Sequence, residues 1–136
     1  MRTKDVENIE LTMPAQPELL VLARLHAGAA GGLLDLNVDE IDDLRLAVEE
    51  LCLWALDQRL TKKELLRVVF SWSGDAIEAS CRLLGEDGAP IPREEHAATG
   101  PSALSERILD ALVTEHGLTE EDGSWAAWFR KSRPTT

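Results

Sequence analysis

Residues 44–58 (LRLAVEELCLWALDQ) constrain the fold of this chain more than any other segment. Apolar side chains recur there at helical spacing, and Asn37 with Glu40 three residues later forms a capping-box pattern before them. Carboxylates crowd the first turns, where the positive end of the helix dipole favours them. We therefore predict a long amphipathic helix with one buried stripe, which consists of Ile41, Leu44, Val48, Leu51, Ala55 and Leu56.

The remaining segments alternate between strand-like and helix-like patterns. Strands are expected at residues 8–13, 64–72, 76–84, 117–120 and 124–131. A first helix is expected to begin at Pro17, and a third is expected to begin at Pro101 and Ser102 and to run to about Glu115. The third helix is expected to direct four apolar side chains inward: Leu104, Ile108, Leu109 and Leu112.

Two glycine-containing segments interrupt this pattern. Residues 27–32 (AGAAGG) are expected to weaken and end the first helix, because glycine raises the entropic cost of ordering the backbone; alternatively, the small residues permit close helix packing. Residues 85–100 contain three glycines and two prolines and predict a long loop. The resulting order predicts an α/β two-layer sandwich, with three helices covering one face of a mixed or antiparallel sheet.

Length and charge limit the classes of function. The 136 residues suit a single domain spanning 1–136, with flexible ends at 1–7 and 132–136. A net charge of −11 argues against nucleic acid and anionic membranes as direct partners and suits a basic protein partner. No apolar run approaches the roughly 20 residues of a membrane span, and no signal-peptide pattern opens the chain, so we expect a soluble, cytoplasmic protein.

The cysteines and histidines give no sign of a metal site. Cys52 and Cys81 lie in apolar contexts without ligand spacing and are expected to be buried free thiols. Whether they respond to oxidation stays open at this stage. The histidines, His26, His96 and His116, are scattered and have no adjacent nucleophile.

The element order and the motif in residues 39–57 (DEIDDLRLAVEELCLWALD) resemble the GHKL ATPase fold. More narrowly, they resemble the anti-sigma-factor serine kinases of bacterial partner-switching systems, whose second helix carries the signature L-x-L-A-V-x-E-x-x-x-N-A. The matching residues are Leu44, Leu46, Ala47, Val48, Glu50 and Ala55. The segment ELTMPAQPELLVLAR also resembles the family's opening strand, turn and first helix.

The resemblance implies a role for Glu50 and exposes a departure at Trp54. In an active family member the signature glutamate activates the attacking hydroxyl, and the asparagine four residues later binds the Mg²⁺ of ATP from the same helix face. This chain has Trp54 at the asparagine position. An indole offers one N–H donor and no lone pair to a hard cation.

Two further nucleotide motifs depart from the family pattern. In the family, the motif D-x-G-x-G follows the hairpin. This chain has Leu83 at the aspartate position and Asp87 at the second glycine position. If the alignment to the motif is shifted by one residue, Gly85 and Gly88 remain usable as its glycines, but no aspartate stands at its first position. The glycine-rich phosphate cradle before the third helix is reduced to Gly100. Together the three departures predict a degenerate ATP site.

The resemblance therefore implies an anti-sigma factor that sequesters a sigma factor and is released by a STAS-type anti-anti-sigma factor. It also implies a homodimer. We expect lost kinase activity, no cofactor and no metal. One alternative is an active serine kinase that uses ATP and Mg²⁺ with Glu50 as its catalytic residue; another is a GHKL-like scaffold for an unrelated protein.

Arg24 matches the arginine with which the family binds its partners; the alternative interpretation of Arg24 is a solvated surface residue. Trp54 is interpreted as a core plug in the vacated cavity or as a binding hot spot.

Overall fold

The computed structural model describes residues 8–92 and 101–133. Within them, five strands form one antiparallel sheet in the order β1-β2-β3-β5-β4. The strands are β1 (Asn8–Pro14), β2 (Leu65–Ser73), β3 (Ala76–Leu84), β4 (Glu115–Glu121) and β5 (Ser124–Ser132). A short 3₁₀ turn, η2 (Pro17–Leu19), precedes the helices α1 (Leu20–Leu33), α2 (Val38–Gln58) and α3 (Ala103–Leu112).

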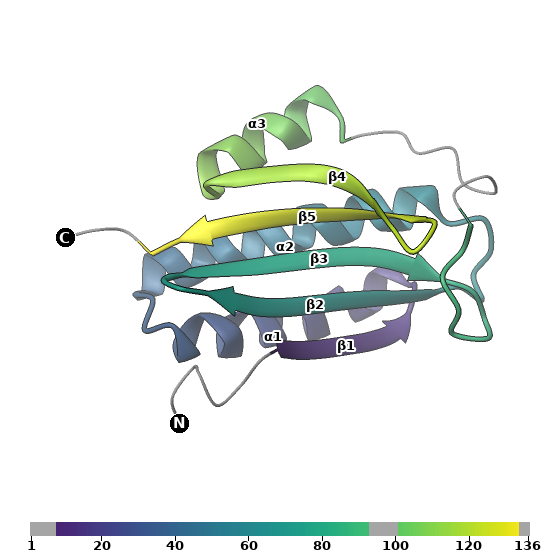
Figure 1. Ribbon diagram of the computed structural model, residues 1–136, viewed down its shortest axis with the longest axis horizontal. Helices are drawn as coiled ribbons and strands as arrows, with labels where there is room; N and C mark the ends of the chain where they lie inside the picture. The colour runs from purple at the N-terminus through teal and green to yellow at the C-terminus, as the bar shows by residue number, and fades with distance from the viewer. Residues whose placement is uncertain (1–7, 93–100, 134–136) are drawn as a thin grey trace.

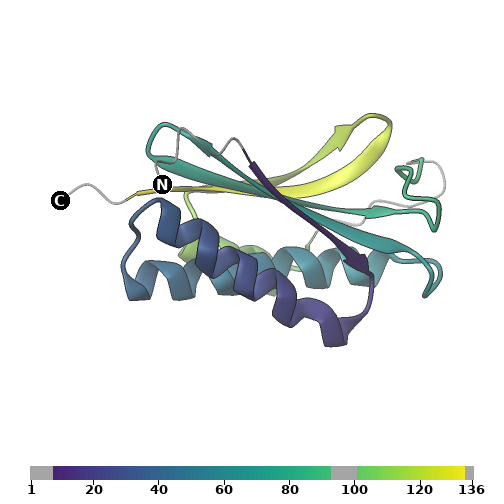
Figure 2. The same ribbon diagram turned by 90° about the horizontal axis from the view of Figure 1, so that it is seen from below.

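The helices form the second layer of the molecule. Figures 1 and 2 show them on one face of the sheet, with the other face left open. The predicted order of elements and the two-layer sandwich are therefore confirmed, and the sheet is antiparallel throughout. None of the helices that the structure describes combines the length and apolarity needed to cross a bilayer.

Helix α2 begins with the predicted capping box. The backbone N–H of Glu40 donates to Asn37 Oδ1 at 2.9 Å, and the backbone N–H of Asn37 donates to Glu40 Oε1 at 2.9 Å. Two N–H groups at the helix start are thus satisfied. The predicted stripe faces the sheet, with Ile41 partly buried and its other five members buried.

Helix α1 runs through the glycine-containing residues 27–32 and ends at Leu33, so the prediction that this run ends the helix is wrong. The alternative of close helix packing is confirmed. A Cβ atom placed on Gly31 would lie 3.1 Å from Ile41 Cγ1 and 3.2 Å from Leu44 Cδ2. A Cβ atom on Gly28 would lie 2.8 Å from Arg45 Nη2. The small residues let α1 approach α2, and this packing offsets their poor helix propensity.

Helix α3 is shorter than predicted, because it ends at Leu112 and Glu115 already begins β4. Ser102 caps it by accepting a hydrogen bond from the backbone N–H of Ser105 at 3.1 Å. Leu109 is buried, and Leu112 packs against the core. Leu104, in the first turn, is 67% exposed, so its predicted inward orientation is wrong. The first turn of α3 lies outside the contact that buries Leu109.

The core lies between the helices and one face of the sheet. Ala79 on β3 pairs with Phe70 on β2 and with Phe129 on β5, so one small side chain separates two fully buried rings. The small side chain of Ala79 leaves room for the two rings in this layer. Trp125 packs against the core, whereas Trp128 lies on the open face, because residues three apart in a strand point to opposite sides.

Two expectations concern the ends of the chain. Residues 1–7 and 134–136 lie outside the described residues. Ser132 lies in the segment that we expect to be a flexible tail, but it is the last residue of β5 and pairs with Ala76.

Candidate functional site

The most distinctive polar contact on the helical layer joins α1 to α2. Arg24 Nη1 lies 3.0 Å from Glu49 Oε1, and the two side chains are 43% and 29% exposed. The chain turns back between α1 and α2 within residues 34–37, so the two helices run antiparallel and these residues face each other. Sequence reasoning selected Arg24 but missed Glu49, which the short connection and the helical register could have located.

Exposed apolar side chains surround this ion pair. Val21 lies one turn before Arg24 on α1, while Leu46 and Leu53 lie three residues before and four residues after Glu49 on α2. Together with Leu25, these side chains are between 41% and 61% exposed. We name this set the α1–α2 surface; it consists of Val21, Arg24, Leu25, Leu46, Glu49 and Leu53. A cluster of apolar groups with a central charged pair is typical of a protein-binding surface.

Glu50 and Trp54 lie one turn apart on α2, as predicted, but their environments differ. Glu50 is partly exposed, whereas Trp54 is 8% exposed and belongs to the core cluster. The indole therefore fills core volume and does not form an exposed hot spot. Its ring presents no oxygen to a cation, so the residues at this position do not fit a magnesium ion. No group of three His, Cys, Asp or Glu suited to a metal occurs in residues 8–92 and 101–133.

The segment after β3 is closed by its own hydrogen bonds. The N–H of Gly85 donates to Ala89 O at 2.8 Å, and the N–H of Gly88 donates to Gly85 O at 2.9 Å. The N–H of Ala89 donates to Asp87 Oδ1 at 3.0 Å. These backbone donors are used within the turn, so they do not form a cradle for phosphate. Leu83, at the family's aspartate position, is buried, and Gly100 lies outside the described residues.

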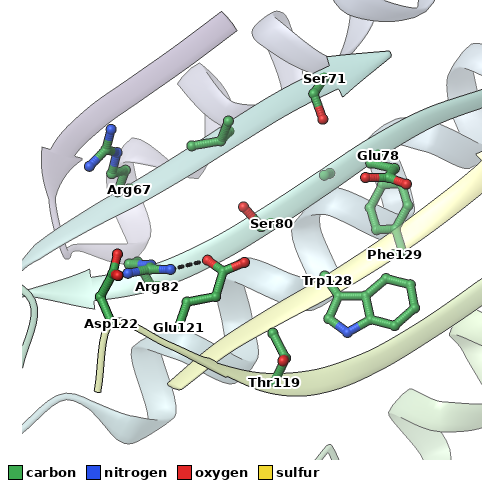
Figure 3. Close-up of a pocket in the computed structure, with 12 residues that line it drawn as sticks. Arg67, Ser71, Glu78, Ser80, Arg82, Thr119, Glu121, Asp122, Trp128 and Phe129 are labelled. Atoms are coloured by element: carbon green, nitrogen blue, oxygen red, sulfur yellow. Dashed lines mark hydrogen bonds and ion pairs between the residues drawn. The ribbon is translucent and has the colours of Figure 1, made fainter. Parts of the chain in front are cut away.

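A cavity of about 680 Å³ lies on the open face of the sheet, on the side opposite the helices. Figure 3 shows its polar lining, which includes Arg67, Ser71, Glu78, Arg82, Glu121 and Trp128. The two arginines are direct cross-strand partners, and each pairs with a carboxylate on an edge strand: Arg67 with Glu10 at 2.8 Å, and Arg82 with Glu121. None of the predicted site residues that the structure describes lines this cavity, although the alternating polar positions of β2 and β3 indicate a solvated face.

Comparison with known proteins identifies relatives over most of the chain. The sequence is 31% identical over 115 residues to proteins named "Anti-sigma-F factor RsbW" from two strains of Mycobacterium tuberculosis. The matched segment covers 84% of this chain and 62% of those proteins. The chain is therefore a homologue of these RsbW proteins. A second relative, "Serine-protein kinase RsbW" from Halalkalibacterium halodurans, is 30% identical over 78 residues, 57% of this chain and 48% of its own length.

These matches confirm the resemblance to serine-kinase anti-sigma factors that residues 39–57 indicate. The match to the RsbW proteins of M. tuberculosis spans less than two thirds of their length. No model of a known protein family matches the chain.

Proposed function

We propose that this RsbW homologue is an anti-sigma factor that sequesters a sigma factor by protein–protein binding. A STAS-type anti-anti-sigma factor releases the sigma factor by competing for the same surface. The observation that carries the proposal is the α1–α2 surface, in which the Arg24–Glu49 pair lies among exposed apolar side chains. The name of the M. tuberculosis relatives, anti-sigma-F factor, supports the same class of partner.

Two properties of the surface suit such binding. A half-exposed arginine beside apolar groups is a common hot-spot arrangement, because the apolar rim excludes water from the charged contact. The chain as a whole carries a net charge of −11, which steers a basic sigma domain towards it at low ionic strength. The homodimer and the cytoplasmic location that we expect from the sequence remain part of the proposal.

The kinase step is lost in this proposal. Phosphoryl transfer depends on metal and dipole stabilisation of a charge-rich transition state. Trp54 replaces an oxygen ligand, Leu83 replaces the adenine-binding aspartate, and the turn after β3 consumes its own N–H groups. Glu50 keeps the signature carboxylate without a partner ligand one turn away. Neither ATP nor Mg²⁺ is therefore a required cofactor.

The binding proposal is tested with purified sigma factors from the source genome and the full chain immobilised for interferometry. We expect one sigma factor to bind, and Arg24→Ala to weaken it by tenfold or more, since an arginine hot spot contributes about 2 kcal/mol or more. Arg107→Ala, at an exposed position on α3, is the matched control and should change the affinity less than twofold. A STAS-domain protein of the same genome should displace the bound sigma factor. Absence of sigma binding, or equal weakening by the two variants, would refute the proposal.

An active serine kinase is the second candidate, because Glu50 is present and the H. halodurans relative is named a serine-protein kinase. Calorimetry with Mg-ATP separates the two candidates. Tight binding, together with phosphate transfer to a STAS-domain protein that Glu50→Gln abolishes, would establish the kinase. No heat of binding and no transfer agree with inhibition by protein binding alone.

A further inference from the structure

The two cysteines of the chain meet across the interface between the helices and the sheet. Cys52 on α2 and Cys81 on β3 are free and fully buried, as the sequence predicts. Their Sγ atoms lie 4.0 Å apart, although 29 positions separate them in the sequence. Cys81 belongs to the strand face that also carries Ile77, Ala79 and Leu83, so its side chain points at the helical layer.

We propose that Cys52 and Cys81 form a reversible disulfide that ties α2 to β3 when the protein meets a hydroperoxide. A disulfide has an S–S length of about 2.05 Å, so the sulfur atoms must approach each other by about 2 Å. The side chains already point at one another across the interface. Disulfide formation is a covalent change within this chain and can be measured without any partner protein. The proposed disulfide therefore does not depend on the proposed function.

The arrangement of the two thiols assigns their order of reaction. Cys81 donates its S–H to the sulfur of Cys52. The pKa of the Cys81 thiol is raised well above its usual value, mainly by burial and to a lesser extent by the contact with Cys52. Cys81 therefore keeps its proton. Because Cys81 keeps its proton, we assign the first attack on the peroxide to Cys52.

The chemistry balances with hydrogen peroxide as the oxidant. The sulfur of Cys52 attacks one peroxide oxygen, the O–O bond breaks, and the departing hydroxide takes the proton of Cys52 to become water; Cys52 is now a sulfenic acid. The sulfur of Cys81 then attacks the sulfur of Cys52, the S–O bond breaks, and the hydroxyl group leaves as water with the proton of Cys81. Two thiols lose two electrons and two protons in total, and the peroxide is reduced to two waters.

The cross-link would join the two layers of the sandwich at its centre. It would close a loop containing all of β2 and the end of α2, which restricts the unfolded chain. The oxidised protein should therefore unfold at a higher temperature than the reduced protein, and dithiothreitol should reverse the shift.

The test treats the folded, reduced full chain with excess hydrogen peroxide, followed by alkylation in denaturant and intact-mass measurement. We expect loss of two hydrogens, no alkylation and a cross-linked peptide that joins Cys52 to Cys81. Cys81→Ala should instead accumulate a sulfenic acid on Cys52 that dimedone traps, and Cys52→Ala should give much less trapping. The mass of the oxidised wild-type chain shows whether the disulfide forms, even if either variant folds poorly.

The same oxidation in urea is the control for folded-state geometry. Intramolecular disulfide should form several times faster in the folded chain than in the unfolded chain, because folding holds the sulfur atoms together. Two alkylatable thiols after peroxide treatment, oxidation to sulfinic acids without a disulfide, or dimers linked between chains would overturn the proposal. Equal rates in the folded and unfolded chains would overturn it as well.

Discussion

Replacing Gly31 by alanine tests whether close packing of α1 on α2 explains the glycines inside α1. The new methyl group would lie 3.1 Å from Ile41 Cγ1 and 3.2 Å from Leu44 Cδ2, which is closer than ordinary van der Waals contact. Leu44 is fully buried and has little room to move. We expect the substitution to force the two helices apart or to strain these side chains.

The magnitude follows from two opposing terms. Alanine is better than glycine in a helix by about 1 kcal/mol. Overpacking a core contact costs about 1–3 kcal/mol. The net effect of Gly31→Ala on the free energy of unfolding should therefore lie between no change and a loss of about 2 kcal/mol.

Gly32→Ala provides the matched control at the next residue of the same helix. A Cβ atom there meets no atom within 4 Å, so only the helix-propensity gain applies. It should raise the free energy of unfolding by about 0.5–1 kcal/mol. Urea unfolding followed by tryptophan fluorescence measures both variants. If Gly31→Ala stabilises the protein as much as Gly32→Ala does, the packing explanation is wrong.

Three further predictions concern other parts of the fold. Asn37→Ala removes one half of the capping box and should lower the free energy of unfolding by about 1 kcal/mol in urea, with an unchanged m value. Because burial holds the pKa of Cys81 above that of the unfolded chain, the unfolded state loses this proton first as the pH rises. Stability should therefore fall above about pH 9 with a slope of up to about 1.4 kcal/mol per pH unit, and Cys81→Ala should lack that contribution. In thermal and urea unfolding, Leu109→Ala should cost about 2–5 kcal/mol, whereas Leu104→Ala should change stability by less than about 0.5 kcal/mol; equal losses would contradict the burial difference between these leucines.

The sequence predicts the elements whose causes are local. The capping box of Asn37 and Glu40 fixes the start of α2, and alternation fixes β3 at its observed bounds. The match of residues 39–57 to a family signature indicates a resemblance to serine-kinase anti-sigma factors, and the comparisons confirm this resemblance. The burial of Trp54 also follows the interpretation of this residue as a core plug.

The features that the sequence does not predict depend on distant contacts. Gly31 is tolerated inside α1 because Ile41 and Leu44 of α2 lie against it, and this contact cannot be seen in a local sequence pattern. Leu104 fits the apolar stripe of α3, but it is 67% exposed, so none of the described residues covers it as the core covers Leu109. The pairing of Arg24 with Glu49 and the 4.0 Å separation of Cys52 from Cys81 likewise require the packed layers.

The position of β1 and β4 at the two borders of the sheet has a consequence for solubility. Among residues 8–92 and 101–133, no further strand pairs with the outer side of either border strand, and such strands can pair with other molecules. Glu10, Glu115 and Glu121 on these borders are ion-paired with Arg67, Arg130 and Arg82, so the repulsion between two molecules that meet edge to edge at neutral pH comes from the net charge of −11 of the whole chain.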